Sequence, residues 1–420
     1  MSIRDSYDDI VRCNRCGFCQ VACPVFRATG HESGVARGRV SLLRAIVEGR
    51  MEWNRELEAA LFACLLCGAC TANCFPGVPT AELITRARQD YLERVGRKSS
   101  HSLLFNHLLP YPERLRLAAK TVGLGQRSGL SRVAQALGLL RIFGRDFPRG
   151  LDLMEDFPAR FLRERVPPGR LPGRGRELTV AYFTGCGMDI MAPRAAESSI
   201  ELLKGFAQSV HVLPNACCGL PARSYGDIEA CRNLARRNLD LLSRSEFDML
   251  VTDCSSCASF LKKYPDLFDP ADPLFTMARH VASRTRDLVE VAGNAARPFP
   301  EGTKPLPVTY HDPCHASRGQ GLRLEPRELL RSVPGLEYRE LQEADWCCGG
   351  PGTYAITNYE LSRSVLQRKV RNIEATEAEA VFTSCPACIV QLRYGLRLFG
   401  ARARVLHISQ ATSEELCSKA

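Results

Sequence analysis

Eight of the 20 cysteines in this 420-residue chain form two runs with the same spacing. In each run, two, two and three residues separate successive cysteines, and a proline follows, directly in the first run (Pro24) and one residue later in the second (Pro76). Three such closely spaced thiolates bind three irons of a [4Fe–4S] cubane, and the fourth cysteine ligates the neighbouring cluster. The spacing predicts two cubanes, one bound by Cys13, Cys16, Cys19 and Cys74 and the other by Cys64, Cys67, Cys70 and Cys23.

Zinc is the alternative for these two runs, because paired cysteines also bind zinc in reducing compartments. Zinc takes four ligands in two pairs. It explains neither the third cysteine of each run nor the fourth cysteine before the proline. Iron–sulfur clusters are therefore the stronger interpretation.

Ten further cysteines form two sets of five in the second half of the chain. Each member of the second set follows its counterpart by 128 to 131 residues, which indicates a duplicated unit. Five thiols exceed the needs of one zinc ion, and adjacent cysteines would form a strained disulfide. We expect one or two further iron–sulfur clusters, bound by Cys186, Cys217, Cys218, Cys254 and Cys257 and by Cys314, Cys347, Cys348, Cys385 and Cys388.

The segments around these two sets alternate between strand-like and helix-like patterns, which indicates a parallel α/β sheet in each copy. Every cysteine group follows a predicted strand. Ligands bind at the carboxyl edge of such sheets, so three loops should bring five thiols together. Strands are expected at residues 178–183, 210–213, 249–252, 308–310, 336–341 and 380–383, and helices at 195–206, 228–242 and 360–373.

The cysteine groups also divide the chain into domains. The predicted fold class is α/β, an N-terminal all-helical ferredoxin-like module followed by a duplicated parallel α/β Cys-Cys-Gly unit. Runs rich in proline and glycine at 167–175 and 295–307 are interpreted as linkers. The expected domains are 1–90 (twin [4Fe–4S] module), 91–176 (basic helical linker), 177–293 (first Cys-Cys-Gly domain) and 305–410 (second Cys-Cys-Gly domain).

Composition argues against secreted and membrane-spanning proteins. The first 13 residues hold no apolar run, which predicts no signal peptide, and no stretch of about 18 apolar residues occurs. The formal charge of +10 arises within residues 91–176, which hold 17 Lys and Arg against 7 Asp and Glu. Three roles remain open for this segment: a solvated helical spacer, docking to an acidic flavoprotein or anionic lipid, and nucleic-acid binding. No alternation of aromatic and basic residues supports the last, so no nucleic-acid partner is expected.

The chain resembles the glycolate oxidase iron–sulfur subunit family, which is related to the iron–sulfur subunits of D-lactate dehydrogenase and heterodisulfide reductase. Besides the cysteines, the resemblance includes Cys16-Gly-Phe-Cys19, Ala36-Arg-Gly-Arg39, Phe183-Thr-Gly-Cys186, His311-Asp-Pro-Cys314-His315, Gln320-Gly-Leu-Arg323 and Lys369-Val-Arg-Asn-Ile373. It implies an electron-transfer subunit that relays electrons from an FAD-binding subunit, which oxidises glycolate or D-lactate, to a quinone or other acceptor. The chain would then be cytoplasmic, or peripheral at the inner face of the membrane.

The complete five-cysteine sets depart from the glycolate oxidase group, whose members often have one cysteine in place of Cys254-x-x-Cys257 and Cys385-x-x-Cys388. Complete sets are more similar to heterodisulfide reductase, in which they hold noncubane [4Fe–4S] clusters. The alternative function is therefore a catalytic subunit that reduces a disulfide at such a cluster. No flavin or nicotinamide motif is found, so hydride chemistry is expected on a partner.

Two histidines flank Cys314. As a hypothesis, His311 or His315 donates a proton or a hydrogen bond to a cluster and so tunes its potential. The alternative is that His311 and Asp312 cap a loop.

Overall fold

The computed structural model describes residues 2–97, 99–139, 152–154, 157–293, 305–350, 352 and 354–412. The predicted linker at 295–307 lies almost wholly outside these residues. So do Leu140 and Phe143, part of an apolar stripe that the sequence suggests for the basic segment.

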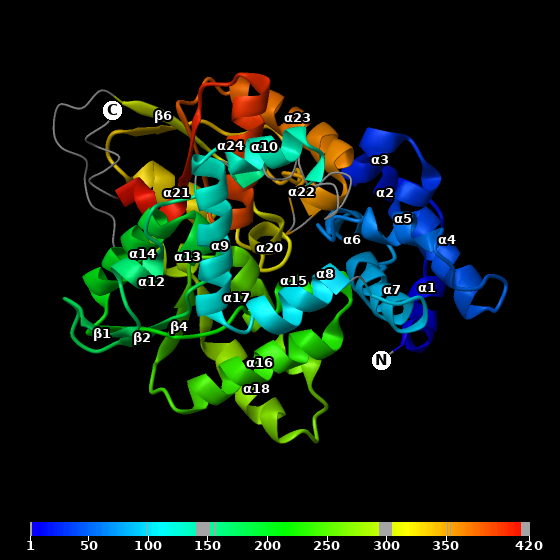
Figure 1. Cartoon of the computed structure of the whole chain (residues 1–420), viewed down its shortest axis with the longest axis horizontal. Coiled ribbons are helices and arrows are strands. Elements are labelled where there is room, and N and C mark those ends of the chain that lie inside the picture. Colours follow the sequence, from blue (N-terminus) through cyan, green and yellow to red (C-terminus); the bar gives the residue numbers. More distant parts are fainter. Residues whose placement is uncertain are drawn as a thin grey trace.

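The N-terminal module is all-helical, as predicted, and lies on one side of the molecule (Figure 1). Its own core includes Leu43, Leu83 and Ile84, none of which has measurable exposure. The cysteine runs lie in the loops and short helices between the longer helices. The helices are α1 (Tyr7–Val11), α2 (Phe18–Ala22), α3 (Pro24–Thr29), α4 (Ala36–Val47), α5 (Leu57–Phe62), α6 (Ala69–Ala72) and α7 (Thr80–Arg94).

The basic segment is helical in its described part and lies against the first Cys-Cys-Gly copy. Helix α9 (Pro112–Arg127) packs through Ala119 and Gly123, and the Phe157 ring lies so close to Gly123 that a side chain there would press on it. The segment also contains α8 (Ser99–Leu103), the π-helix η3 (Leu104–Leu108), α10 (Leu130–Ala136) and α12 (Leu162–Arg165).

The first Cys-Cys-Gly copy contains a five-stranded sheet in the order β1-β3-β2-β4-β5. Strands β2 to β5 are parallel, and β1 is antiparallel to β3. The interpretation of residues 167–175 as a linker is therefore wrong in part. Proline is tolerated in β1 because it is an edge strand. The strands are β1 (Gly169–Pro172), β2 (Thr179–Tyr182), β3 (Ser209–Val212), β4 (Met249–Thr252) and β5 (Thr285–Asp287).

The second copy contains a four-stranded parallel sheet in the order β7-β6-β8-β9, which matches β3-β2-β4-β5 of the first. The predicted strands and helices are found with small shifts of their ends. The final strand of each copy, β5 and β9, was not predicted. The second-copy strands are β6 (Leu306–Tyr310), β7 (Leu336–Tyr338), β8 (Ala380–Thr383) and β9 (Arg404–His407), and the long helices of both copies are α14 (Pro193–Phe206), α16 (Ile228–Ser243) and α23 (Tyr359–Glu374).

The two copies face each other at the carboxyl ends of their strands. The Ser255 hydroxyl donates to the Ser384 hydroxyl at 2.7 Å, and the Ser255 backbone N–H donates to the Ser384 carbonyl at 3.0 Å. The N-terminal module contacts both copies, since α3 packs against α23 and α7 packs against α15 (Leu220–Tyr225) (Figure 1). All four cysteine groups therefore lie near a common junction.

Candidate metal centres

The first cavity of the N-terminal module is ringed by thiols from both cysteine runs. It has a volume of about 380 Å³ and includes Cys74 of the second run as well as the first three cysteines of the first run. This exchange of the fourth cysteine is what the spacing predicts for a pair of cubanes. Cys16 is exposed at the cavity mouth. The lining cysteines are Cys13, Cys16, Cys19, Cys70 and Cys74.

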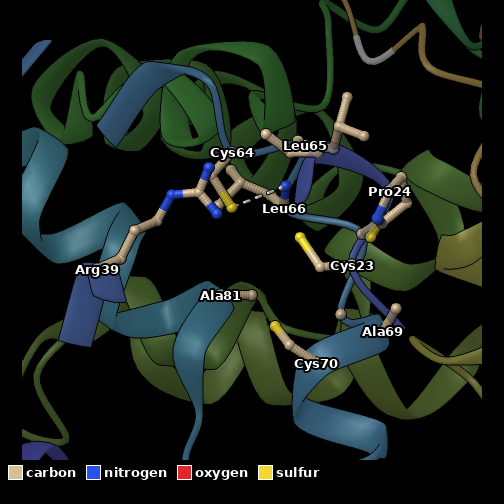
Figure 2. A pocket seen from close by; sticks show the side chains of 12 residues that line it. Cys23, Pro24, Arg39, Cys64, Leu65, Leu66, Ala69, Cys70 and Ala81 are labelled. Atoms are coloured by element: carbon tan, nitrogen blue, oxygen red, sulfur yellow. Dashed lines mark hydrogen bonds between the residues drawn. The ribbon is translucent and has the colours of Figure 1, made fainter. Parts of the chain in front are cut away.

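The second cavity is of similar size, about 350 Å³, and has the reciprocal composition. Figure 2 shows the sulfurs of Cys23, Cys64 and Cys70 turned toward a common space. Cys70 lines both cavities, so the two sites are direct neighbours. Which cysteine binds which cluster stays a prediction. The lining cysteines are Cys23, Cys64, Cys67 and Cys70.

The two cysteine loops repeat one unusual backbone conformation. Arg15 and Leu66, which precede the second cysteine of each run, both have positive φ, of 54° and 52°. Gly17 and Gly68, which follow that cysteine, have φ of 88° and 72°. Non-glycine residues seldom adopt this conformation, and it persists where the surroundings enforce it. The repeat explains why glycine occupies the same place in both runs.

Buried arginines surround the second cavity. Arg39 is 2% exposed, its Nε donates to the Ala60 carbonyl at 2.7 Å, and among the described residues its Nη2 has no hydrogen-bond partner. Figure 2 shows this guanidinium directed at Cys64. Arg88 donates to the carbonyls of Leu61 and Cys64, and burial lowers its pKa to about 10. A free donor and positive charge suit an anionic sulfide-containing cluster.

Helix N-termini position most of the thiols in the Cys-Cys-Gly copies. Cys186 and Cys314 are the first residues of α13 (Cys186–Met191) and α20 (Cys314–Ser317). Cys254 and Cys385 cap α17 (Ser255–Leu261) and α24 (Pro386–Phe399). The positive end of a helix dipole stabilises a thiolate, which is the form that binds metal.

The glycine of each Cys-Cys-Gly motif has a steric reason. Gly219 and Gly349 have φ of 98° and 86°. A Cβ at Gly349 would lie 2.8 Å from the Ser362 carbonyl oxygen, and one at Gly219 would lie 3.2 Å from the Cys231 carbonyl oxygen. Only glycine therefore lets the adjacent cysteine pair sit this close to the helix beneath it.

The first five-cysteine set converges as predicted. The Sγ atoms of Cys186 and Cys217 are 3.8 Å apart, and further thiol interactions link Cys217 to Cys218, Cys218 to Cys257 and Cys257 to Cys254. Interactions with Cys217 and Cys257 lower the pKa of the Cys218 thiol to about 5. A thiolate at neutral pH is thus favoured inside this set.

The second set converges in the same way. The Sγ atoms of Cys348 and Cys388 are 3.5 Å apart, and Cys388 also interacts with Cys385. The thiols of Cys347 and Cys388 hold the pKa of Cys348 well below its ordinary value, with a smaller contribution from the nearby His311 ring. Cys314 lies close enough for other thiols of the junction to raise its pKa, although burial raises it most.

Two thiol interactions join the four groups, and the sequence indicated neither. Cys67 of the N-terminal module interacts with Cys347, which lowers the pKa of Cys67 to about 6. Cys254 of the first set interacts with Cys385 of the second. The second set therefore lies between the N-terminal module and the first set.

The histidines beside Cys314 differ in their surroundings. His315 Nδ1 lies 2.9 Å from the Ser256 hydroxyl and 4.0 Å from the Cys314 Sγ. Among the described residues, neither ring nitrogen of His311 has a hydrogen-bond partner. Both carboxylate oxygens of Asp312 accept from Arg327 at 3.0 Å. Capping of the loop by the His311 side chain is therefore wrong.

Of the two remaining cysteines, Cys231 is buried in α16, where burial raises its pKa to about 12. Cys417 lies outside the described residues. Within the described part of the chain, no helix combines the length and the apolar character needed to cross a membrane.

Comparison with known proteins identifies the parts of the chain. Residues 9–78 match the family described as 4Fe-4S dicluster domain, and residues 180–262 and 308–393 each match the cysteine-rich domain. Residues 94–157 match the linker region of the glycolate oxidase iron-sulfur subunit.

Individual relatives agree with these matches. Lactate utilization protein A 2 of Bacillus cereus is 28% identical, covering 57% of this chain and 99% of that protein. An iron–sulfur relative from Methanothermobacter marburgensis, one component of its fumarate reductase (CoM/CoB), is 31% identical, covering 53% of this chain and 43% of that protein. A probable glycolate oxidase iron-sulfur subunit of Bacillus subtilis is 31% identical, covering 97% of this chain and 94% of that protein. With its cysteine sets gathered as described, this iron–sulfur protein belongs to the glycolate oxidase iron–sulfur subunit family.

Proposed function

We propose that this chain relays electrons from a partner flavoprotein that oxidises glycolate or D-lactate. Oxidation of a 2-hydroxy acid to the 2-oxo acid releases two electrons and two protons, which an FAD-binding subunit would take up. An iron–sulfur cluster passes electrons one at a time, and a quinone would accept two electrons and two protons to become the quinol. The names of the glycolate oxidase and lactate utilization relatives support this substrate class.

The observation that carries the proposal is the unbroken series of neighbouring thiol groups. Cys70 is shared by the two N-terminal cavities, Cys67 interacts with Cys347, and Cys385 interacts with Cys254. We assign one [4Fe–4S] cubane to each N-terminal cavity, with Cys13, Cys16, Cys19 and Cys74 as ligands of the first and Cys64, Cys67, Cys70 and Cys23 as ligands of the second. We assign one further [4Fe–4S] cluster to each five-cysteine set.

Metal analysis tests the cofactor assignment. Protein purified without oxygen should contain about sixteen irons per chain and as many sulfides, four for each of four clusters. About eight irons would restrict the clusters to the N-terminal module. Stoichiometric zinc in place of iron would overturn the proposal.

Reduction by substrate tests the relay. The chain, purified anaerobically in complex with its flavoprotein, is mixed with glycolate or D-lactate, and flavin and cluster absorbance are followed together. The proposal expects the flavin to be reduced first and the clusters after it. Clusters that stay oxidised beside a reduced flavin would contradict a relay.

The complete five-cysteine sets favour a second candidate, reduction of a disulfide at a Cys-Cys-Gly cluster of noncubane type. All ten thiols of these sets are present, and each set gathers its members as closely as one cluster requires. Addition of a thiol to the oxidised protein should then produce a paramagnetic signal that is lost in Cys347→Ser. No signal would favour the relay alone.

The basic segment offers a surface for the quinone side of the reaction, at an anionic membrane. Leu117 and Leu124 of α9 are 67% and 68% exposed, on the side of the helix away from Ala119 and Gly123. Further exposed leucines continue beyond the helix, and the segment holds the positive charge of the chain. Exposed leucines flanked by Lys and Arg are typical of peripheral membrane contact. The further leucines are Leu103, Leu130, Leu137 and Leu139.

Vesicle sedimentation tests this membrane contact. The chain should sediment with phosphatidylglycerol vesicles and not with phosphatidylcholine vesicles, and L117E/L124E should stay in solution. Equal sedimentation of the double variant would exclude α9 as the contact.

A further inference from the structure

His311 is unusual among the buried polar side chains of the second Cys-Cys-Gly copy. It is 1% exposed, directly after strand β6, and its two ring nitrogens have no hydrogen-bond partner among the described residues. His407, which is fully buried in the same copy, has Nδ1 at 2.8 Å from the Ser409 hydroxyl and Nε2 at 2.8 Å from the Asp253 carbonyl. A buried imidazole without partners is unfavourable unless another group meets it.

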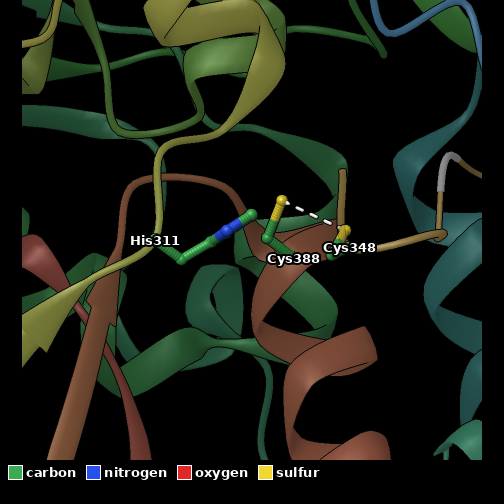
Figure 3. Close-up of side chains that lie close together, drawn as sticks. All are labelled: His311, Cys348 and Cys388. Carbon is green, nitrogen blue, oxygen red and sulfur yellow. Dashed lines mark hydrogen bonds between the residues drawn. The ribbon is translucent and has the colours of Figure 1, made fainter. Parts of the chain in front are cut away.

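The imidazole points at two cysteines of the second set. A ligand nitrogen of His311 and the Sγ atoms of Cys348 and Cys388 all lie within 4.8 Å of one another (Figure 3). The two sulfurs are 3.5 Å apart. Atoms at these separations can bind one iron, because iron–sulfur and iron–nitrogen bonds of just over 2 Å place the ligands of a tetrahedral metal about 3.5 to 4 Å apart.

The first copy has no such group. Phe183 occupies the equivalent position, 128 residues earlier, and is fully buried. The backbone is the same at both places, since the Phe183 N–H donates to the Val251 carbonyl at 2.8 Å and the His311 N–H donates to the Phe382 carbonyl at 2.9 Å. The imidazole is therefore a specific feature of the second site and not a requirement of the fold.

We propose that His311 is a nitrogen ligand to the iron bound by Cys348 and Cys388. The second site would then be a mixed nitrogen–sulfur site and the first an all-sulfur site. This inference rests on the proposed function, which assigns a cluster to the second set. Five thiols and one imidazole exceed one ligand per iron of a four-iron cluster, so one iron takes more than one protein ligand, and these three donors are close enough to share it.

A neutral imidazole in place of a thiolate lowers the negative charge of a cluster and raises its reduction potential, as in Rieske centres. The second set lies between the N-terminal module and the first set. His311 would thus make the middle site a better electron acceptor than an all-thiolate site at the same place.

Pulsed electron paramagnetic resonance of the reduced protein, labelled with ¹⁵N in histidine only, tests the ligand. The wild type should show a nitrogen coupling of the size of a directly bound imidazole. H311F, which copies the first repeat, should lose it, and H315A should keep it. A wild type without the coupling, or an H311F that retains it, would overturn the inference.

Iron and sulfide analysis separates this outcome from failure of the proposed function. If the wild type lacks the iron of the second set, the proposed function fails. If the iron is present and the coupling is absent, only the role of His311 fails. H311C guards against a misfolded H311F, because a thiolate at this position should retain the cluster, lose the nitrogen coupling and lower the reduction potential. A potential in H311C equal to that of the wild type would contradict the ligand role.

Discussion

The two Cys-Cys-Gly copies have one scaffold and two different surroundings. Both bring five thiols together at the carboxyl edge of a parallel sheet, with cysteines at helix N-termini. In the described part of the chain, it is the second copy whose Cys347 interacts with a cysteine of the N-terminal module. The first copy reaches the module's cysteines through the second, by way of Cys254 and Cys385. Duplication thus supplied two similar sites, and packing made one of them the middle of the series.

Cys67→Ser is the change expected to have the largest effect on this comparison. Cys67 lines the second cavity and interacts with Cys347, so its loss should remove about four irons and disconnect both copies from the first cavity. Cys186→Ser, at the far end of the series, should leave the N-terminal module fully reducible. Iron content and the fraction of clusters reduced by substrate measure both variants. If Cys186→Ser blocked reduction of the N-terminal module, the order of sites would be wrong.

Two arginines attach the N-terminal module, one to each copy. Arg88 is buried and donates to Leu61, Cys64 and, in the first copy, Ser224. Arg318 of the second copy donates to the Cys67 carbonyl at 3.4 Å and pairs with Asp345 at 2.9 Å. Arg88→Ala should lower the free energy of unfolding by about 3–5 kcal/mol, because it strands three carbonyls and removes a buried charge.

Arg318→Ala is the matched variant for the second copy. Its longer hydrogen bond and partly exposed partner predict a smaller loss, about 1–2 kcal/mol. Urea unfolding of both variants under anaerobic conditions gives the comparison. Equal losses would show that the two attachments do not differ as their burial indicates.

The last strands of the two copies hold opposite titrating groups at equivalent positions. Asp287 pairs in register with Thr252, and His407 with Thr383. Burial raises the pKa of Asp287 from 3.8 to about 6 and lowers that of His407 from 6.5 to about 4. Between pH 4 and 6 the folded state retains the Asp287 proton that the unfolded state loses, so stability falls as pH rises. The folded state lacks the His407 proton that the unfolded state binds, so that contribution rises with pH.

The two slopes should nearly cancel in the wild type and appear separately in variants. Asp287→Asn should gain about 3 kcal/mol of unfolding free energy as pH increases from 4 to 6, and His407→Asn should lose about as much. Denaturation at several pH values measures the slopes. Parallel curves for the two variants would contradict the assignment of opposite shifts.

Ser384→Ala is expected to have the smallest effect. The Ser384 hydroxyl contacts the Ser255 hydroxyl at 2.7 Å and the Tyr310 hydroxyl at 2.9 Å, across and beside the boundary between the copies. Its loss should cost about 1–2 kcal/mol, since buried hydroxyls are left without a partner. Ser243→Ala, on the exposed end of α16, should change stability by less than about 0.5 kcal/mol in the same urea titration. A neutral Ser384→Ala would mean that the boundary does not depend on this contact.

Local patterns were informative where one segment carries the whole signal. The strands β4 and β8 and helix α5 agree with their predicted ranges because apolar periodicity is a property of a few adjacent residues. Strands β5 and β9 escaped prediction because Thr285–Asp287 and Arg404–His407 are short and partly polar. Strand β1 escaped because its proline and glycine are tolerated only at the edge of a sheet, and an edge is defined by the neighbouring strands.

The sequence by itself determined the cysteine motifs, the duplication and the kind of metal chemistry, because each depends on residue type and spacing along the chain. Tertiary structure alone decided which groups are neighbours. Cys67 and Cys347 are 280 residues apart, and Cys254 and Cys385 are 131 apart, so their contacts depend on how the module and the two copies pack. The same holds for His311, whose position beside Cys348 and Cys388 follows from three separate strands ending at one edge.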